Sequence, residues 1–239
     1  MPEGIYAAAA GMAAQQAQLD AVSNDIANVN TTGYKSERLG FRDLIYTAEQ
    51  GQPVGAGAAS VDLGRTSAEG SLTQTGDPLS VAILGPGFIQ VKRADGSIGL
   101  TRDGQLSIDA KGSIVTTSGE RLDPPLTVPP GTDGSAIAIA ADGTVTAAGA
   151  KIGQIQLVDV PAPGQLLSVG DNLFAPTAAS GAPAAVKGST IQQGALESSN
   201  VDLAAAMVNM IEAQRGYELA SRAIKTQDQL LDDANGLVR

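Results

Sequence analysis

Matching apolar repeats of seven residues at the two ends of the chain place the strongest constraint on its fold. Such a repeat puts one narrow apolar seam along an α-helix, and the seam requires a helical partner. Because the middle of the chain lacks the repeat, the two ends are expected to pair with each other or with neighbouring copies. The repeat positions are Ile5, Met12, Leu19 and Ile26 near the N-terminus, and Leu203, Met210, Tyr217, Ile224, Leu231 and Val238 near the C-terminus.

Two interpretations of these seams are open. The simpler one has two amphipathic helices packed on the sheet of a monomer. Helix-to-helix packing is favoured because alanine fills most companion positions, such as Ala206, Ala213 and Ala220, and a narrow seam suits close helix approach. The other faces are expected to be polar, without a second apolar stripe.

The composition excludes several classes of function. The 239 residues include no Cys and no His, so disulfides, thiolate nucleophiles, imidazole catalysis and the usual zinc sites are excluded. A net charge of −10 argues against binding to nucleic acid or to an anionic membrane surface. No apolar run is long enough to span a bilayer. The N-terminus lacks a basic and apolar signal peptide, so any export is expected to use another route.

The central part of the chain reads as short strands and turns. Asp-Gly pairs between alternating apolar segments predict β-hairpins, because the tight turn requires positive φ. Four such pairs begin at Asp95, Asp103, Asp133 and Asp142. The segment 50–60 is rich in Gly and Ala and is expected to be a surface loop.

The predicted fold class is α+β, with long N- and C-terminal helices in a coiled-coil-like pair and a mainly antiparallel β central domain. The first helix is expected to begin near Pro2. For the last helix, Ser199 followed by Asp202 approximates a capping box. The expected parts are residues 1–33 as N-terminal helix, 34–75 as extended connector with the Gly-rich loop, 76–195 as β-rich domain and 196–239 as C-terminal helix.

No constellation of residues points to catalysis, a cofactor or a metal. Gly85-Pro86-Gly87 is a plain turn, because no complete phosphate-binding motif surrounds it. The Asp-Gly pairs lack the alternating oxygen ligands of a calcium loop. A carbohydrate-active enzyme with a carboxylate pair and a secreted β-rich surface protein are the alternatives from other classes.

Three groups of motifs resemble those of the bacterial flagellar rod and hook proteins of the axial filament. The N-terminal group is 19–35, ending in Thr32-Gly33-Tyr34-Lys35, and the C-terminal group is 194–218, beginning Gly194-Ala195-Leu196-Glu197. The central group includes Leu100-Thr101-Arg102-Asp103-Gly104 and Gly170-Asp171-Asn172-Leu173-Phe174. Within the family the likeness is to the distal rod subgroup, with the proximal rod subgroup and a short hook-type subunit as alternatives.

The resemblance implies a structural subunit without enzymatic activity or cofactor. Its terminal helices would polymerise into a helical tube around the export channel, with homopolymer, other axial proteins, the surrounding ring proteins and the flagellar export apparatus as partners. It implies a place in the basal body within the cell envelope. Both termini are expected to be disordered in the monomer and to fold on assembly. The expected subunit contacts are Ile5, Met12, Leu19, Val22, Ile26, Leu203, Met207, Met210, Ile211, Tyr217, Ile224 and Leu231.

Overall fold

The computed structural model describes residues 3–47, 53–186 and 188–237. Pro2, Val238 and the start of the expected loop at 50–52 lie outside these ranges. The chain divides into two compact units: a helical unit of residues 1–27, 37–64 and 202–239, and a β unit of residues 28–36 and 65–201. Across the described ranges, no helix is both long and apolar enough to cross a membrane.

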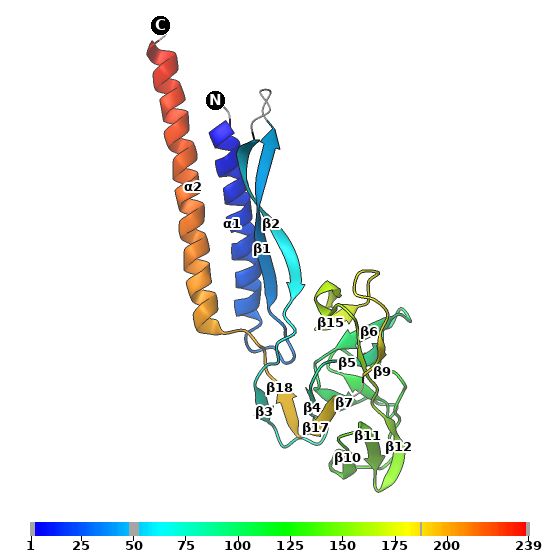
Figure 1. Ribbon diagram of the computed structural model, residues 1–239. Helices are drawn as coiled ribbons and strands as arrows, with labels where there is room; N and C mark the ends of the chain where they lie inside the picture. Colours follow the sequence, from blue (N-terminus) through cyan, green and yellow to red (C-terminus); the bar gives the residue numbers. More distant parts are fainter. Residues whose placement is uncertain (1–2, 48–52, 187, 238–239) are drawn as a thin grey trace. The chain divides into compact units, whose positions relative to one another are not determined.

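The helical unit contains two long helices and one two-stranded ribbon. Helix α1 (Glu3–Ala27) lies between helix α2 (Leu203–Leu237) and the ribbon of β1 (Glu37–Thr47) and β2 (Pro53–Arg65) (Figure 1). The terminal helices therefore face each other within one subunit, and α1 is covered on two sides.

Reciprocal contacts between glycine and glutamine set the close approach of the two helices. A Cβ atom at Gly216 of α2 would lie 2.9 Å from the side chain of Gln15 in α1. A Cβ atom at Gly4 of α1 would likewise lie 2.9 Å from the side chain of Gln227 in α2. Residue numbers rise along one helix as they fall along the other, so the pair is antiparallel.

Two boundaries differ from the sequence prediction. The Gly-rich segment is not a loop throughout, because β2 begins at Pro53 and pairs with β1. The last helix begins at Leu203 rather than 196, since residues 195–197 form a strand.

The cap of α2 also differs from the prediction. Asp202 is the N-cap: its Oδ1 atom accepts hydrogen bonds from the backbone N–H groups of Ala204 at 2.9 Å and Ala205 at 3.1 Å. Ser199 instead accepts a bond from the N–H of Val201. A carboxylate also neutralises the positive end of the helix dipole, which explains why the aspartate caps the helix.

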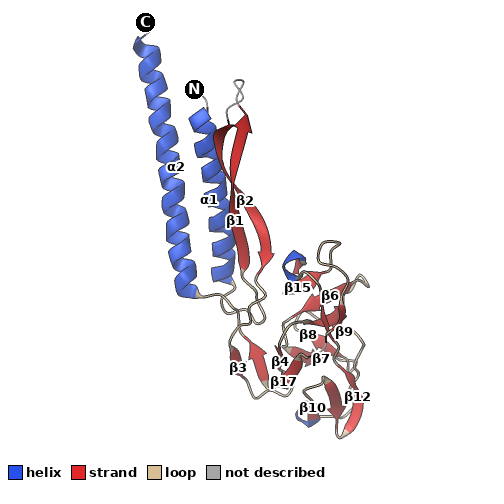
Figure 2. Ribbon diagram, in the orientation of Figure 1, coloured by secondary structure: helices blue, strands red, loops and turns tan. Residues whose placement is uncertain are grey.

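The β unit is built from short strands, all of whose described pairings are antiparallel (Figure 2). The main sheet runs in the order β14-β15-β6-β5-β9-β8-β7, and β13 joins β5 to β16. Three further small sheets are β10-β11-β12, β17-β4 and β18-β3. The bounds are β3 Leu72–Gln74, β4 Val81–Leu84, β5 Phe88–Lys92, β6 Ile98–Thr101, β7 Leu106–Ile108, β8 Ile114–Thr116, β9 Arg121–Leu122, β10 Ile137–Ile139, β11 Thr144–Ala147, β12 Ala150–Gln154, β13 Leu157–Asp159, β14 Leu167–Gly170, β15 Leu173–Ala175, β16 Ala184–Ala185, β17 Thr190–Gln193 and β18 Ala195–Glu197.

Two of the four Asp-Gly pairs form the predicted hairpin turns. Gly96 (φ +84°) joins β5 to β6, and Gly143 (φ +84°) joins β10 to β11. The pair at Asp103 was predicted wrongly, because β6 and β7 are not neighbours in the sheet. The pair at Asp133 begins a 3-10 helix, which Asp133 caps. Asp-Gly signals a reversal of the chain, but pairing of the flanking strands depends on the rest of the sheet.

The core of the β unit is aliphatic, as the scarcity of aromatic residues requires. Ile89, Val91 and Leu100 are fully buried in the main sheet. A second, smaller cluster contains the aromatic pair Phe88 and Phe174, whose ring centroids lie 5.9 Å apart in an edge-to-face arrangement. This second cluster lies beside the charged site described next.

Candidate functional site

The three segments through which the chain enters or leaves the β unit meet at one buried charged junction. Residues 28–36 supply Lys35, residues from 65 onward supply backbone groups, and the end of β18 supplies Glu197. Arg102, which directly follows β6, completes the junction from within the sheet. We call Lys35, Arg102 and Glu197 the buried triad.

Both oxygens of the Glu197 carboxylate are bound from several sides. Lys35 Nζ donates to Oε1 at 2.5 Å, and the N–H of Gly70 donates to the same oxygen at 2.8 Å. Arg102 Nη1 lies 3.3 Å from Oε1 and 3.2 Å from Oε2. Lys35 Nζ also donates to the carbonyl oxygen of Ala68 at 2.7 Å. The carboxylate therefore joins residues that are far apart in the sequence.

Arg102 uses the remainder of its guanidinium to hold the turn before β5. Its Nε atom donates to the carbonyl oxygen of Gly87 at 2.9 Å, and Nη2 donates to that of Gly85. Its Cζ atom lies 5.8 Å from the ring centroid of Phe88. Carbonyl dipoles and an aromatic face both stabilise a cation that is largely removed from solvent.

The triad carries two positive charges and one negative charge, all on buried side chains. Lys35 and Arg102 are each 4% exposed, and Glu197 is 1% exposed. Burial lowers the pKa of Lys35, and the hydrogen bond and charge of Glu197 oppose that effect. Since a buried charge without a partner is very costly, each member depends on the others.

Glycine is required at position 33, where the segment 28–36 approaches the backbone of Arg102. Its φ of +69° is unfavourable for residues with a side chain, and a Cβ atom there would lie 2.7 Å from the carbonyl group of Arg102. The Gly33 N–H donates to the carbonyl oxygen of Glu197 at 2.8 Å. Two residues later, Lys35 reaches the side chain of the same glutamate.

Asn200 holds the last segment to the other two. Its Oδ1 atom accepts from the N–H of Ser36 at 2.8 Å, and its Nδ2 atom donates to the carbonyl oxygen of Ala68 at 2.8 Å. The N–H of Asn200 donates to the carbonyl oxygen of Tyr34. Side-chain and backbone bonds together fasten the three segments, so the junction acts as a structural clamp. No group of three acidic side chains in the described ranges is placed to hold a metal ion.

The twelve residues expected as subunit contacts fall into three classes in the single subunit. Val22 is buried. Six are half-buried: Ile5, Met12, Leu19, Ile26, Met210 and Ile224. Five are exposed: Leu203, Met207, Ile211, Tyr217 and Leu231. Among the residues of α2 whose burial is described, the alanines Ala206 and Ala213 are the buried positions.

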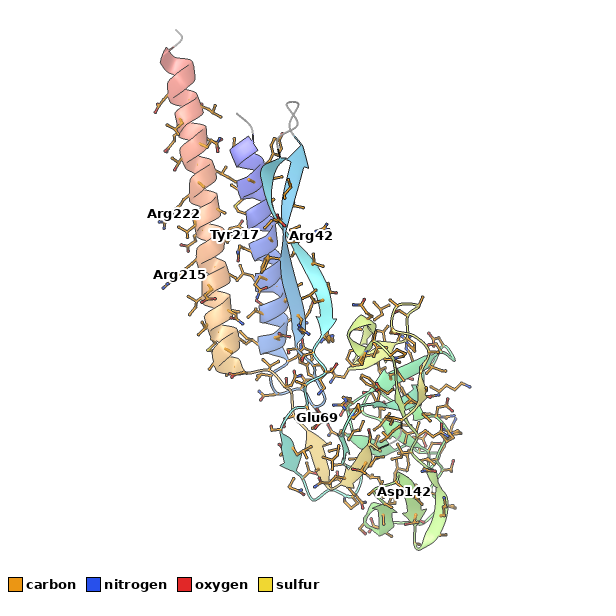
Figure 3. The ribbon with its side chains drawn as sticks, in the orientation of Figure 1. Arg42, Glu69, Asp142, Arg215, Tyr217 and Arg222 are labelled. Carbon is orange, nitrogen blue, oxygen red and sulfur yellow. The ribbon has the colours of Figure 1, made fainter. Side chains whose placement is uncertain are left out.

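Helix α2 has a second apolar face, which the sequence prediction excluded. Met207, Val208 and Ile211 are each about half exposed, and Leu219 is 65% exposed. Arg215 follows Ile211 by four residues, and residues four apart share a helix face. Figure 3 shows Arg215 and Arg222 on the side of α2 away from α1, and Tyr217 on the side toward it. We call Met207, Val208, Ile211, Arg215 and Leu219 the outer face of α2.

The sequence prediction did not identify the buried triad as a site, although it named the motifs that contain all three residues. Lys35, Arg102 and Glu197 each lie in one of the three motif groups that carry the family resemblance. The signal that could have indicated the site is that each of the three motif groups contains one of these charged residues. The sequence could not show that the three charges meet, because Lys35 and Glu197 are separated by 162 positions.

Comparison with protein families gives three matches in the order of the chain. The flagella basal body rod protein family matches residues 5–35, the flagellar hook protein FlgE/F/G D1 domain matches 82–147, and the flagellar basal body rod FlgEFG protein C-terminal domain matches 192–237. These matches define a flagellar axial protein of the rod and hook class. Each matched region contributes one member of the buried triad.

Individual relatives match over nearly the whole chain. The flagellar basal-body rod protein FlgG of Agrobacterium fabrum is 39% identical over 93% of this chain and 94% of its own length. FlgG of Borreliella burgdorferi is 36% identical over 100% of both chains, and the rod protein FlgF of Caulobacter vibrioides is 33% identical over 96% and 95%. The chain belongs to the flagellar basal-body rod protein family. The expected likeness to the distal rod subgroup is confirmed by the FlgG relatives.

Proposed function

We propose that this chain is a structural subunit of the flagellar rod, in which copies polymerise through their terminal helices into a helical tube. The tube surrounds the export channel and transmits torque. Full-length similarity to rod proteins supports the assignment, and the uncovered apolar residues of α2 support the mode of assembly. A repeated contact between unlike surfaces that does not close on itself generates such a filament.

The subunit contacts follow from which residues α1 leaves uncovered. Ala206 and Ala213 face α1 of the same subunit, whereas Leu203, Met207 and Ile211 are exposed. Exposed side chains of this size gain about 1.5–3 kcal/mol each on full burial. The outer face of α2 and the exposed seam positions are therefore the surfaces that neighbouring copies cover.

The partners follow from this role. They are further copies of the chain, other axial proteins of rod and hook, the surrounding ring proteins and the export apparatus, and the place of action is the basal body. The proximal rod position is the alternative within the same structure, because a FlgF relative is 33% identical. Either position uses the same helices.

The test is a concentration series of the purified chain, followed by sedimentation and circular dichroism on the same samples. We expect helix content to rise together with large, rod-shaped assemblies. Hydrogen exchange then shows which residues become helical on assembly. Amides in 203–231 should exchange rapidly in the dilute monomer and slowly in the polymer. A compact monomer with full helix content at every concentration would contradict folding on assembly.

A further inference from the structure

An apolar cavity with a positively charged wall adjoins the buried triad. It has a volume of about 60 Å³, which exceeds the roughly 10–15 Å³ that one water requires. Its apolar lining comes from Pro86, Phe88, Pro163, Leu166 and Phe174. The cavity is open at the surface of the β unit, where Thr66 and Ser67 form part of its rim.

A continuous series of cations and aromatic rings runs beside this cavity, from Tyr34 through Arg65, Phe174 and Phe88 to Arg102. Arg65 Cζ lies 5.1 Å from the ring centroid of Tyr34 and 5.8 Å from that of Phe174. Phe174 contacts Phe88, whose other neighbour is Arg102. The rings of Tyr34 and Phe174 hold the Arg65 guanidinium between them, so the cation is positioned without a carboxylate.

The cations that line the cavity differ in their carboxylate partners. Lys35, Arg65 and Arg102 line it, against Asp159 as the one acidic lining residue. Glu197 binds both Lys35 and Arg102, and Glu69, whose Oε1 atom accepts from the N–H of Gly85, adds a second negative charge near Lys35. Arg65 donates to the carbonyl oxygen of Lys35 at 2.7 Å, and within the described residues no carboxylate lies within 4 Å of it. Its remaining N–H groups are available to an incoming acceptor.

We propose that this cavity is a docking pocket for an acidic peptide segment of a partner protein, with one apolar side chain in the cavity and an adjacent carboxylate on Arg65. Charge complementarity selects this occupant: the apolar lining accepts a hydrocarbon group, and the Arg65 guanidinium, which has no carboxylate partner among the described residues, binds an anion. The planar guanidinium, already oriented by two rings, is suited to bidentate carboxylate binding.

Two small probes that differ only in charge test the proposal. N-acetyl-phenylalanine carries the ring and the carboxylate, and its carboxamide carries the ring alone. Each is titrated into the full-length protein at a concentration where it is monomeric, and amide shifts are followed by NMR. We expect shifts at Gly87, Phe88 and Leu166, and about tenfold weaker binding of the carboxamide, as for loss of one charge-assisted hydrogen bond.

Substitutions of residues that line the cavity test whether the probes bind there. Arg65→Gln should weaken the carboxylate probe about tenfold and leave the carboxamide unchanged. Because Arg65 also holds Lys35, a second variant leaves the wall intact: Ser67→Glu places a competing carboxylate on the exposed rim and should have the same effect. Ser107→Glu, exposed on β7, is the matched control and should bind normally.

Three results would overturn the proposal. The carboxylate probe could shift none of the pocket amides, the carboxamide could bind as tightly as the carboxylate, or Ser67→Glu could bind normally. None of these results bears on polymerisation through α2, so the proposed function is tested separately.

Discussion

The ammonium group of Lys35 lies 2.5 Å from a carboxylate oxygen of Glu197, although 162 positions separate the two residues in the chain. With Arg102 on the same carboxylate, this contact closes the β unit at the point where three segments enter or leave it. Buried charge therefore fastens these three segments to one another within the β unit. Substitutions of the three side chains are therefore expected to lower the stability of the β unit by different amounts.

Replacement of the shared anion should cost more than replacement of one cation. Glu197→Gln leaves two buried cations without a carboxylate and is expected to destabilise the β unit by about 3–5 kcal/mol. Lys35→Met leaves the Arg102–Glu197 pair and removes the surplus charge, so its cost should be clearly smaller. Urea denaturation of both variants measures the difference. Glu218→Gln, an exposed helix position, is the control, and a larger loss for Lys35→Met would contradict the charge argument.

Addition of one methyl group at Gly33 should disturb the same junction. Gly33→Ala combines an unfavourable φ with a Cβ atom 2.7 Å from the Arg102 carbonyl group, and we expect a loss of about 2–3 kcal/mol. Gly119→Ala is the matched control, because Gly119 has a φ of +87° but open space around its Cα. Thermal melting of both variants separates the steric effect from the backbone effect. Equal losses would show that the contact with Arg102 is unimportant.

Acid should weaken the turns of the β unit. Hydrogen bonds from the N–H and hydroxyl of Thr144 hold the pKa of Asp142 below its usual range. A carboxylate with a lowered pKa contributes stability above about pH 4, and that contribution is lost as the pH falls through the lowered value. The urea midpoint should therefore fall between about pH 5 and pH 3, and fall less in Asp142→Asn. An unchanged pH dependence in the variant would exclude Asp142 as a contributor.

Removal of the α2 cap should loosen only the start of that helix. Asp202→Ala removes the acceptor of two backbone N–H groups and should cost about 1 kcal/mol of helix stability. Hydrogen exchange should accelerate in the first turn after Leu203 in the assembled protein. Ser199→Ala is the comparison, since it tests the cap that the sequence suggested. Faster exchange in Ser199→Ala than in Asp202→Ala would reverse the assignment.

A charge on the outer face of α2 should prevent assembly without unfolding the β unit. Ile211 is about half exposed, so Ile211→Asp should abolish polymerisation and leave the β unit folded. Leu231→Asp should do the same from the seam. Sedimentation measures the polymer yield, and the thermal transition of the β unit reports folding. Lys225→Asp, on the exposed surface of α2, is the control, and a normal polymer yield from Ile211→Asp would place the contact elsewhere.

Local patterns in the sequence were sufficient for the element types and for the family. The seven-residue repeats predicted both helices, and the Asp-Gly pairs at 95 and 142 predicted their hairpins. The motif groups identified the rod family. Helix periodicity, turn geometry and short motifs depend on residues close together in the chain, so the sequence carries them directly.

Those local patterns could not predict which strands and side chains pair when they lie far apart in the sequence. Strand order decided that the turn at Asp103 joins strands that do not pair, and packing decided that β2 replaces most of a predicted loop. The repeat also assigned the seam to subunit contacts as a whole, whereas α1 covers its alanines within one subunit.

The sequence by itself determined the helices, the β character of the middle and the absence of thiol and imidazole chemistry. Only the tertiary structure decided that Lys35, Arg102 and Glu197 share one buried site, and that α2 presents a second apolar face. The physical reason is that burial and charge pairing depend on which distant segments come together. A charged residue in a motif has the same appearance in the sequence whether water or a buried partner surrounds it.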